Sequence, residues 1–398
     1  MLRSVQPPTV GISRIAVYEP PWVLGNDWFA NTLARKFVQH TGIQSRHVSV
    51  EDETAMAVRA VRKLQEETGC DLRDCAALVF VSPSLIERRV ARHYFDESVA
   101  RRESTNRAAW QLVHRLGIPA APSRGINWGC SGYSKSFSLL RRHLLPPLRL
   151  GREEFILVVT ASRISRITDY ACKETGPLFG DLATATLVSR VDSTRHPVRF
   201  ELLFAAAGTQ SSQRTFFDYH WREDILTPAP GGGRSRAPRR LVFFLDGLGI
   251  ADAAPRAMAL ATARAIRAAR LGPEELRFIV PHQAGTGIVR FTAMKLEELG
   301  IRGEVINGLT SEVGNVSSCS IPYALLRTWD RLEGTIACPT AGVGAPGAPT
   351  VSYGCILLRA VASRPATCPP PLPAERSPCE PGCQYATSSR SRAVSPSA

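Results

Sequence analysis

Residue types able to perform acyl chemistry occur at Cys130, His282 and Asn315. Cys130 lies in the stretch Asn-Trp-Gly-Cys-Ser-Gly-Tyr, between a polar turn and an apolar run that is typical of a helix. A thiol at a helix N-terminus feels the positive end of the helix dipole, which lowers its pKa and makes it nucleophilic. The sequence therefore predicts a reactive Cys130 with a lowered pKa. The alternative is a small buried hydrophobic side chain, since free cysteine is among the most buried residue types.

His282 and Asn315 occupy positions that suit a catalytic site. His282 follows an apolar run at residues 276–280, and α/β proteins bind ligands at the ends of such strands. Asn315 follows Gly314 and opens a second helix. The alternatives are a hydrogen-bonded turn histidine and a helix N-cap. Together with a cysteine nucleophile, the two polar side chains suit thioester acyl transfer, where charge develops on a carbonyl or enolate oxygen.

The elements that must position these residues alternate along the chain, which predicts an α/β fold. Strands are predicted at residues 11–18, 76–81, 155–160 and 276–280, and helices at residues 53–67 and 255–270. An Arg-rich stretch at residues 87–115 favours a surface or cap helix.

The second half of the chain repeats the plan of the first. The stretch around Cys130 has a counterpart at residues 314–327, and a strand at 183–190 has a counterpart at 350–359. The repeat predicts an N-terminal half at residues 10–195 and a C-terminal half at 196–362, packed so that the three candidate residues share one pocket. Residues 231–240 are predicted to form a flexible basic loop, and the Pro- and Ser-rich residues 363–398 a disordered tail.

The composition excludes several classes of protein. The chain has 398 residues, 44% of them hydrophobic, which is enough for a large core. It has no apolar run of about 18 residues and no apolar core of a secretory signal near its start, so we expect a cytoplasmic protein without membrane insertion. The 10 cysteines are scattered and do not indicate a disulfide framework. Cys379 and Cys383 lack the further ligands of a zinc site, so no metal is predicted.

The net charge of +14 indicates an acidic partner. Four arginines and two glutamates lie beyond residue 362, so +2 belongs to the tail and +12 to the rest. Nucleic acid, an anionic membrane or an acidic carrier protein would each satisfy such a charge. The sequence contains no zinc-finger, RNA-binding or helix-turn-helix signature, which disfavours nucleic acid.

Several short motifs occur in a characteristic order. They are Thr41-Gly42-Ile43 with Arg46, the Cys-Ser-Gly at Cys130, Leu178-Phe179-Gly180-Asp181, Val280-Pro281-His282-Gln283-Ala284, Gly314-Asn315-Val316-Ser317-Ser318 and Ala341-Gly342-Val343-Gly344. In these motifs the chain resembles the β-ketoacyl-acyl-carrier-protein synthase III family, of the thiolase-like superfamily, over residues 10–361.

The resemblance implies a five-layered α-β-α-β-α fold, a homodimer and an acyltransferase without a resident cofactor. Cys130 would accept an acyl group from acyl-CoA or an acyl carrier protein, and His282 and Asn315 would stabilise the enolate formed when a malonyl-carrier substrate loses CO2. The product would be a 3-oxoacyl thioester for fatty-acid or secondary-metabolite synthesis. The backbone N–H groups of Cys130 and Gly344 would form the oxyanion hole. Phe179 and Asp181 would shape the pocket wall and a turn.

Departures from the family pattern concern substrate binding. Gly285 replaces an Asn that follows the His-Gln-Ala motif. Lys36 and His40 stand where a Trp and an Arg hold the CoA nucleotide, and Lys173 stands where an Arg stacks on adenine. Positive charge is kept and stacking surface is lost, which favours a carrier protein as acyl donor and a secondary pathway. With Phe179, these four are the candidate substrate-binding residues.

The sequence leaves two other functions open. One is acyl transfer to oxygen, nitrogen or another carbon acid, such as a second β-keto thioester, without decarboxylation. The presence of Asn315 argues against it, because that residue serves the decarboxylative step. The other is a non-catalytic subunit that supports an active relative, and the intact set of Cys130, His282 and Asn315 argues against that.

Overall fold

The structure is a computed structural model of the chain. It describes residues 8–29, 33, 35–86, 94, 104–119 and 121–361. The predicted tail, residues 363–398, lies outside the described residues, as do residues 87–93 and 95–103 of the predicted cap segment. Residues up to Ala362 form one unit, and the description below concerns that unit alone.

Ten strands form one mixed sheet in which each half of the chain contributes five neighbouring strands. The first half supplies β1 (Val10–Tyr18), β4 (Cys75–Val81), β5 (Ser123–Ile126), β6 (Phe155–Ser162) and β7 (Leu182–Arg190), in the order β5-β4-β6-β7-β1. The second half supplies β8 (Phe200–Ser211), β11 (Leu276–Ile279), β12 (Glu304–Val305), β13 (Thr335–Val343) and β14 (Thr350–Ala360), in the order β12-β11-β13-β14-β8.

The two sets of strands have the same pairing pattern. In each, the first strand pairs antiparallel with the last, and the two pairs at the far edge are parallel. The sets join where β1 pairs with β8 at Gly11↔Glu201 and Ile12↔Phe200. The internal repeat noted in the sequence is therefore present in the topology, whereas the boundary at residues 195 and 196 stays a prediction.

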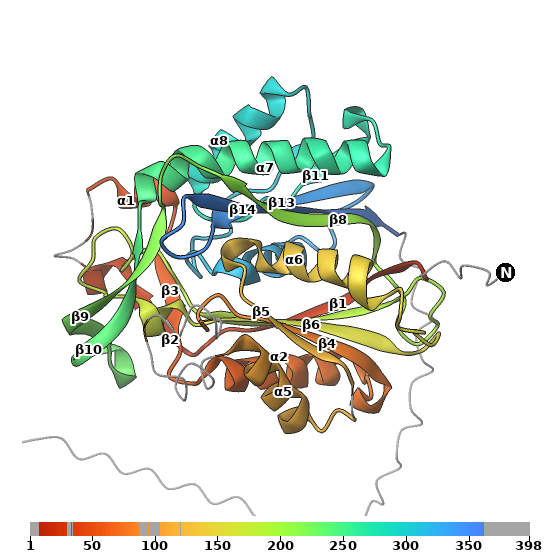
Figure 1. Ribbon diagram of the computed structural model, residues 1–398, viewed down its shortest axis with the longest axis horizontal. Coiled ribbons are helices and arrows are strands. Elements are labelled where there is room, and N and C mark those ends of the chain that lie inside the picture. The colour runs from red at the N-terminus through yellow and green to blue at the C-terminus, as the bar shows by residue number, and fades with distance from the viewer. Residues whose placement is uncertain are drawn as a thin grey trace, which may run out of the picture. The chain divides into compact units, whose positions relative to one another are not determined.

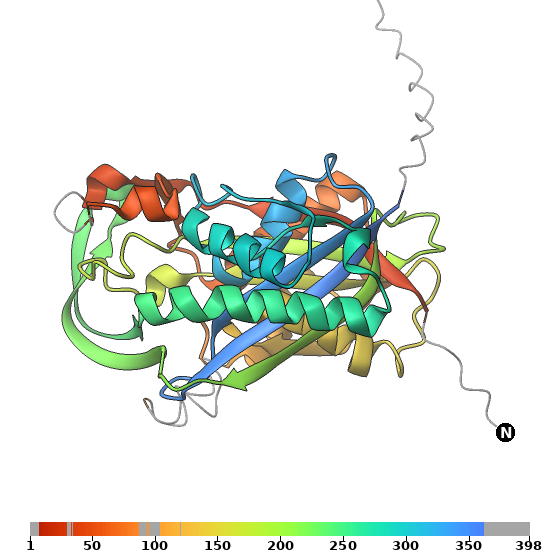
Figure 2. The same cartoon turned by 90° about the horizontal axis from the view of Figure 1, so that it is seen from above.

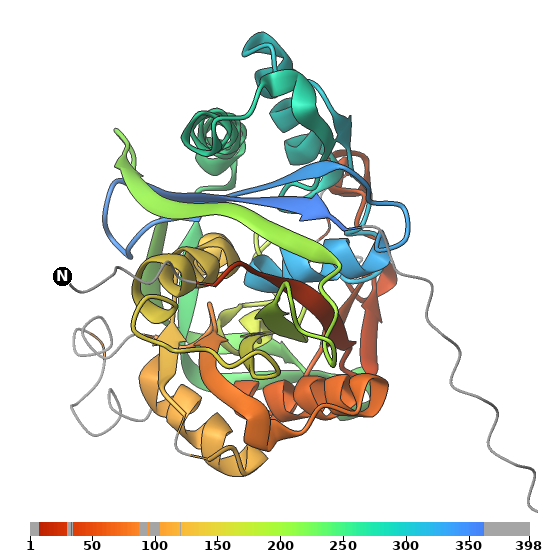
Figure 3. The same cartoon turned by 90° about the vertical axis from the view of Figure 1, so that its right-hand side faces the viewer.

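Helices separate and cover the two sets of strands, which gives five layers (Figures 1 and 3). One outer layer holds α2 (Glu53–Thr68) and α5 (Thr105–Leu116), the other α7 (Gly247–Ala269) and α8 (Thr286–Glu298), and the middle layer α6 (Gly132–Leu139) and α9 (Ser320–Arg327). Figure 2 shows α7 lying across the strands of the second half. Separate apolar clusters fill the spaces between outer helices and strands, and a further cluster surrounds the middle helices. The predicted α/β class and five layers are confirmed.

The sequence patterns explain why these elements form. All eight residues of β6 are buried, so the strand reads as a continuous apolar run rather than an alternating one. Helix α2 buries an apolar stripe and is capped at its start by Asp52, whose side chain accepts a hydrogen bond from the Ala55 N–H. It is capped at its end by Gly69, which adopts the left-handed conformation common at helix ends.

The predicted flexible loop at residues 231–240 is wrong. Residues from Arg234 onward form β10 (Arg234–Leu245), which pairs with β9 (Phe217–Pro228) in a long hairpin (Figure 1). Contacts across the hairpin order the basic segment: Arg236 forms an ion pair with Asp224, and Arg239 lies over the Trp221 ring at 4.8 Å. The charged residues and the proline give this strand the composition of a loop, but pairing with β9 holds it in place.

Helix α7 also differs from its prediction, which started it at Pro255. It starts eight residues earlier, at Gly247, because Asp246 caps it by accepting a hydrogen bond from the Gly249 N–H at 2.9 Å. Pro255 is therefore inside the helix rather than at its first turn. Among the described residues no helix is long and apolar enough to cross a membrane.

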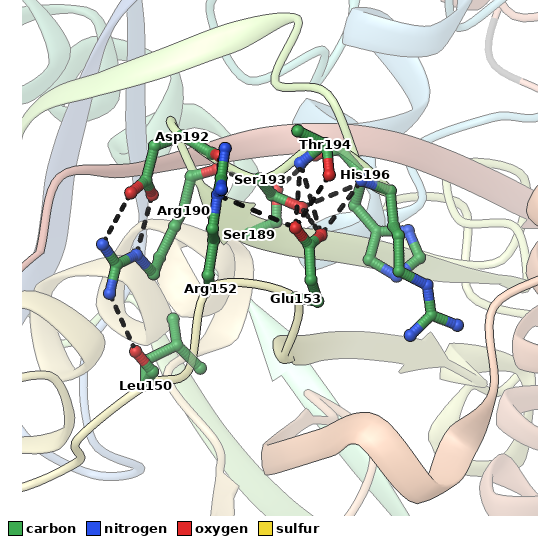
Figure 4. A network of polar contacts seen from close by, with 10 residues as sticks. Leu150, Arg152, Glu153, Ser189, Arg190, Asp192, Ser193, Thr194 and His196 are labelled. Carbon is green, nitrogen blue, oxygen red and sulfur yellow. Dashed lines mark hydrogen bonds and ion pairs between the residues drawn. The ribbon is translucent and has the colours of Figure 1, made fainter.

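A polar network fastens the connection between the two halves (Figure 4). Residues 191–199 link β7 to β8, and the Glu153 carboxylate reaches them from the turn before β6. It accepts hydrogen bonds from the Ser193 and Thr194 hydroxyls, both at 2.8 Å, and from the Arg195 N–H at 3.0 Å. The Arg195 N–H contributes most to holding the pKa of Glu153 at about 2, against an ordinary carboxyl value near 4.

We expect Glu153→Gln to lower the melting temperature by a few degrees at neutral pH without affecting the active site. Because the folded pKa is depressed, the stabilisation is present above the ordinary carboxyl pKa and is lost as pH falls toward 2. The difference between variant and parent in thermal unfolding should therefore shrink through that window. Glu66→Gln, on the exposed face of α2, is the matched control and should leave the melting temperature unchanged. A pH-independent difference would contradict the prediction.

Candidate active site

Cys130 lies in a 3-10 turn, Gly129–Ser131, that leads directly into α6. Gly129 has a φ of 49°, in the left-handed region that glycine adopts without steric cost. The side chain of Asn127 holds this turn: its Oδ1 accepts from the Gly129 N–H at 3.2 Å, and its Nδ2 donates to the Leu85 carbonyl at 2.6 Å. Asn127 thus fixes the first residue of the turn that carries the Cys130 thiol.

The second half contains the same turn. Ser317–Cys319 is a 3-10 turn that leads into α9, and Ser317 has a φ of 50°. Asn315 Oδ1 accepts from the Ser317 N–H at 3.0 Å, as Asn127 does for Gly129. The repeat therefore pairs Asn315 with Asn127, Ser317 with Gly129, and Ser318 with Cys130.

The two turns meet at the thiol. The Ser317 hydroxyl donates to Cys130 Sγ at 3.5 Å, so the thiol of the first half contacts the turn of the second. Gly342 of β13 also packs against Cys130: a Cβ there would stand 2.9 Å from Cys130 Cβ and 3.4 Å from Sγ. Cys130 therefore contacts two elements of the second half.

His282 follows β11, as predicted, and its backbone N–H donates to the Pro339 carbonyl of β13 at 2.9 Å. This ties its backbone to β13, the strand that carries Gly342. The neighbouring Gln283 N–H donates to the hydroxyl of Ser320, the first residue of α9, at 2.7 Å. His282 is 1% exposed, and neither ring nitrogen has a hydrogen-bond partner among the described residues. Burial lowers its pKa to about 4, so the ring is neutral at neutral pH.

Asn315 is held by a parallel pairing with the Leu178–Gly180 segment. Its N–H donates to the Leu178 carbonyl at 3.0 Å, and its carbonyl accepts from the Gly180 N–H at 3.2 Å. With Oδ1 taken by Ser317, the Nδ2 group is the free end of the amide, and it has no hydrogen bond within the described part of the chain. The N-cap alternative is wrong, because Val316 is the N-cap of this turn; one end of the Asn315 side chain holds the Ser317 N–H and the other end is an available donor.

Buried Arg46, from the predicted N-terminal signature, braces this pairing. It is fully buried, and its guanidinium donates to the carbonyls of Pro177 and Leu24. Gly180 and Gly314 both lie against it: a Cβ on either would come within 3.1 Å of Arg46 Cβ. Because these two glycines have no side chain, the backbones at Gly180 and Gly314 pack closely against Arg46, which sets the position of Asn315.

Comparison with known proteins identifies the family. The family models described as 3-oxoacyl-[acyl-carrier-protein (ACP)] synthase III and its C-terminal part match residues 126–205 and 266–359. A β-ketoacyl-[acyl-carrier-protein] synthase III of Staphylococcus saprophyticus is 26% identical over 321 residues, which cover 79% of this chain and 88% of that protein. The chain belongs to the 3-oxoacyl-acyl-carrier-protein synthase III family.

Solved structures give the same fold. The synthase III of Thermus thermophilus is 25% identical, with a TM-score of 0.60 over 89% of this chain and 100% of that one. The priming β-ketosynthase of the R1128 polyketide pathway is 22% identical, with a TM-score of 0.64 over 90% of this chain and 98% of that one. The thiolase-like fold and a condensing acyltransferase of this family are thereby established, and the matched ranges contain Cys130, His282 and Asn315.

Phe179 and Asp181 were expected to shape the pocket wall and a turn, and both are buried in packing contacts. Phe179 is buried and packs edge-on against Phe243 of β10, with ring centres 5.4 Å apart. Asp181 is buried and accepts from the Ser49 N–H at 2.8 Å and from the Ser165 hydroxyl at 2.5 Å. Its carboxylate joins three segments of backbone. Phe179 contributes to an apolar wall beside Asn315.

The predicted substrate-binding residues fall in two places. Lys36 and His40 are exposed at α1 (Phe37–Thr41), which packs on α8. Gly285 is buried at the start of α8, where a Cβ would stand 3.3 Å from Thr41 Cα, so it packs beneath the helix that carries His40. Lys173 is exposed in a turn between β6 and β7. The short strands β2 (Trp22–Gly25) and β3 (Ser45–Val48) flank α1 in sequence.

The second predicted oxyanion donor is already engaged. The Gly344 N–H donates to the Thr350 carbonyl at 3.0 Å, within the β13–β14 connection. A role in the oxyanion hole would require that hydrogen bond to be shared or broken, and it stays a prediction. Gly342 is the residue of this motif that lies against the Cys130 backbone, with a Cβ position 3.1 Å from its nitrogen.

The predicted direction of the Cys130 pKa is wrong. Burial raises the pKa of the thiol, and the hydrogen bond from Ser317 opposes that rise without cancelling it. Cys130 is half-buried, and Gly342 of β13 packs against it from the second half of the chain. Desolvation by residues distant in sequence is invisible in the local motif.

We therefore expect alkylation of resting Cys130 by iodoacetamide to have a pH midpoint above that of a simple free thiol. A raised pKa keeps the thiol protonated at neutral pH, so the reactive thiolate forms only as pH rises. The measurement follows the Cys130 peptide by mass spectrometry, with N-acetylcysteine alkylated in parallel. A midpoint below that of the free thiol would restore the helix-dipole argument.

Proposed function

We propose that this condensing enzyme loads an acyl group on Cys130 and joins it to malonyl-acyl-carrier-protein by decarboxylative Claisen condensation, giving a 3-oxoacyl product. The observation that carries the proposal is the buried ring of His282, neither of whose nitrogens has a hydrogen-bond partner among the described residues. Buried polar groups are normally satisfied, so this ring indicates that the missing partner is a ligand atom, and the Asn315 amide offers its Nδ2 as a second donor.

In the first half-reaction the Cys130 sulfur attacks the carbonyl carbon of an acyl thioester. A C–S bond forms to Cys130, and the C–S bond to the donor breaks, which releases the donor thiol. The Cys130 N–H supplies one hydrogen bond to the oxyanion. Mutational loss of such a donor costs about 3 kcal/mol in comparable sites.

In the second half-reaction the malonyl thioester loses CO2, and the electron pair of the broken C–C bond forms an enolate. His282 and Asn315 donate hydrogen bonds to the enolate oxygen. Because His282 is neutral, it acts as a hydrogen-bond donor rather than as a charged group. The enolate carbon then attacks the acyl-Cys130 carbonyl, a new C–C bond forms, and the Cys130 thiolate leaves.

An acidic carrier protein fits the net charge of +14 and the exposed basic residues Lys36 and Lys173. The structural relative from the R1128 pathway is a priming β-ketosynthase of polyketide biosynthesis. Together with the replaced CoA-stacking positions, this supports a priming role in a secondary pathway over the start of fatty-acid synthesis.

The test is an acyl-donor screen by intact-mass spectrometry. The enzyme is incubated with acetyl-CoA, a longer acyl-CoA or acyl-loaded carrier protein, and Cys130→Ala is the control. We expect one acyl mass on the parent enzyme, strongest from the carrier protein, and none on the variant. Malonyl-carrier protein should then release CO2 and the 3-oxoacyl product. Absence of any Cys130-dependent label would overturn the proposal, and product without CO2 would favour acyl transfer without decarboxylation.

A further inference from the structure

The internal repeat provides a comparison for a residue whose role the motifs do not assign. Gly129 and Ser317 occupy equivalent first positions of the two 3-10 turns, with φ values of 49° and 50°. Both have the N–H bound by an asparagine Oδ1 two residues earlier. Glycine adopts this backbone without cost, whereas a serine side chain is strained there.

Strained non-glycine residues persist where their side chains serve the site. The Ser317 side chain is 3% exposed, and its hydroxyl is the side-chain group that donates to Cys130 Sγ. Its backbone N–H simultaneously fixes the amide of Asn315 so that Nδ2 is the free end. Ser317 therefore contacts both the Cys130 thiol and the side-chain amide of Asn315.

The hydrogen bond from Ser317 opposes the effect of burial on the thiol. A hydroxyl that donates to sulfur stabilises the thiolate more than the thiol, because hydrogen bonds to charged groups are the stronger ones. It also restricts the rotation of the Cys130 side chain, against which Gly342 packs as well.

We propose that Ser317 is a positioning residue that orients the Cys130 sulfur and stabilises its thiolate from the opposite half of the fold. The proposal rests on the proposed function only in taking Cys130 as the nucleophile. It goes beyond that function in assigning thiol activation to a residue of the second half.

The experiment measures the pH dependence of iodoacetamide alkylation at the Cys130 peptide in four proteins: the parent, Ser317→Ala, Ser317→Gly and Ser318→Ala. Both Ser317 variants lose the hydroxyl, and we expect their midpoints to rise by about one pH unit. Ser318 is the matched control, since it is a buried neighbouring serine whose hydroxyl has no partner among the described residues. Its variant should keep the parent midpoint.

Thermal unfolding distinguishes the effect of losing the hydroxyl from the effect of backbone strain at residue 317. Ser317→Gly relieves the strain and should melt at a higher temperature than Ser317→Ala, while the two share the shifted midpoint. Unchanged midpoints in both Ser317 variants would overturn the proposal, and so would an equal rise in Ser318→Ala. Alkylation requires no thioester, so this result is independent of the acyl-donor screen.

Discussion

His282→Ala should lower condensation and malonyl decarboxylation by about 10²–10³-fold while Cys130 still accepts its acyl group. The ring is buried and has both nitrogens free of partners in the described chain, and the residue's backbone N–H is held by the Pro339 carbonyl of β13. Its removal therefore takes away a donor to the enolate and leaves the thiol and its turn in place. Release of CO2 from malonyl-carrier protein and the acyl mass on Cys130 are the two measurements.

His196 supplies the control for that experiment. It is also a buried histidine with an unpartnered ring nitrogen among the described residues, but it lies in the connection between the halves. His196→Gln should leave both measurements unchanged. Equal loss of acylation and decarboxylation in His282→Ala would show that His282 acts on the thiol instead of on the enolate.

The neutral state of His282 also predicts a pH profile. With its pKa held at about 4 by burial, decarboxylation should show no acid limb near 6.5, where an ordinary histidine titrates. The same depression makes the unfolded chain bind more protons than the folded one between pH 6.5 and 4, so this residue lowers stability as pH falls through that window. A decarboxylation limb near pH 6.5 that disappears in His282→Ala would contradict this assignment.

Gly342→Ala should reduce acylation of Cys130 by about 10²-fold. The added methyl would stand 2.9 Å from Cys130 Cβ and 3.1 Å from its nitrogen, and both atoms belong to a turn fixed by Asn127. The turn must move, which displaces both the sulfur and the N–H that serves the oxyanion. The rate of acyl-mass appearance measures the effect.

A second glycine tests whether the methyl group itself is responsible. Gly247, the first residue of α7, would have nothing within 4 Å of an added Cβ. Gly247→Ala should acylate at the parent rate. Parent-like acylation in Gly342→Ala would mean that the space beside the thiol is larger than the structure indicates.

Local patterns in the sequence were enough to single out Cys130, His282 and Asn315 as candidates, because each lies in a short motif beside a strand or helix, and their catalytic roles stay predictions. They were also enough to predict the layered fold, since β6 and α2 carry clear periodicities. The hairpin of β9 and β10 escaped prediction because its order comes from pairing between Arg-rich and acidic segments, as at Arg236 and Asp224.

The environment of the thiol could not be predicted for a similar reason. Gly342 and Ser317 approach Cys130 from about 200 residues away in the chain. A motif can indicate a candidate nucleophile, but burial of its thiol depends on tertiary packing. The left-handed backbone of Ser317 likewise has no signal in the letters Asn-Val-Ser-Ser.

The repeated Asn-anchored turn has a consequence for how this site diverged. The positive φ and the asparagine hydrogen bond recur in both halves, whereas the side chains of the turn differ at each position, Gly129 against Ser317 and Cys130 against Ser318 among them. A shared backbone therefore carries two different sets of side chains. Because the two turns touch at Ser317 and Cys130, a substitution in either half changes the surroundings of the same thiol.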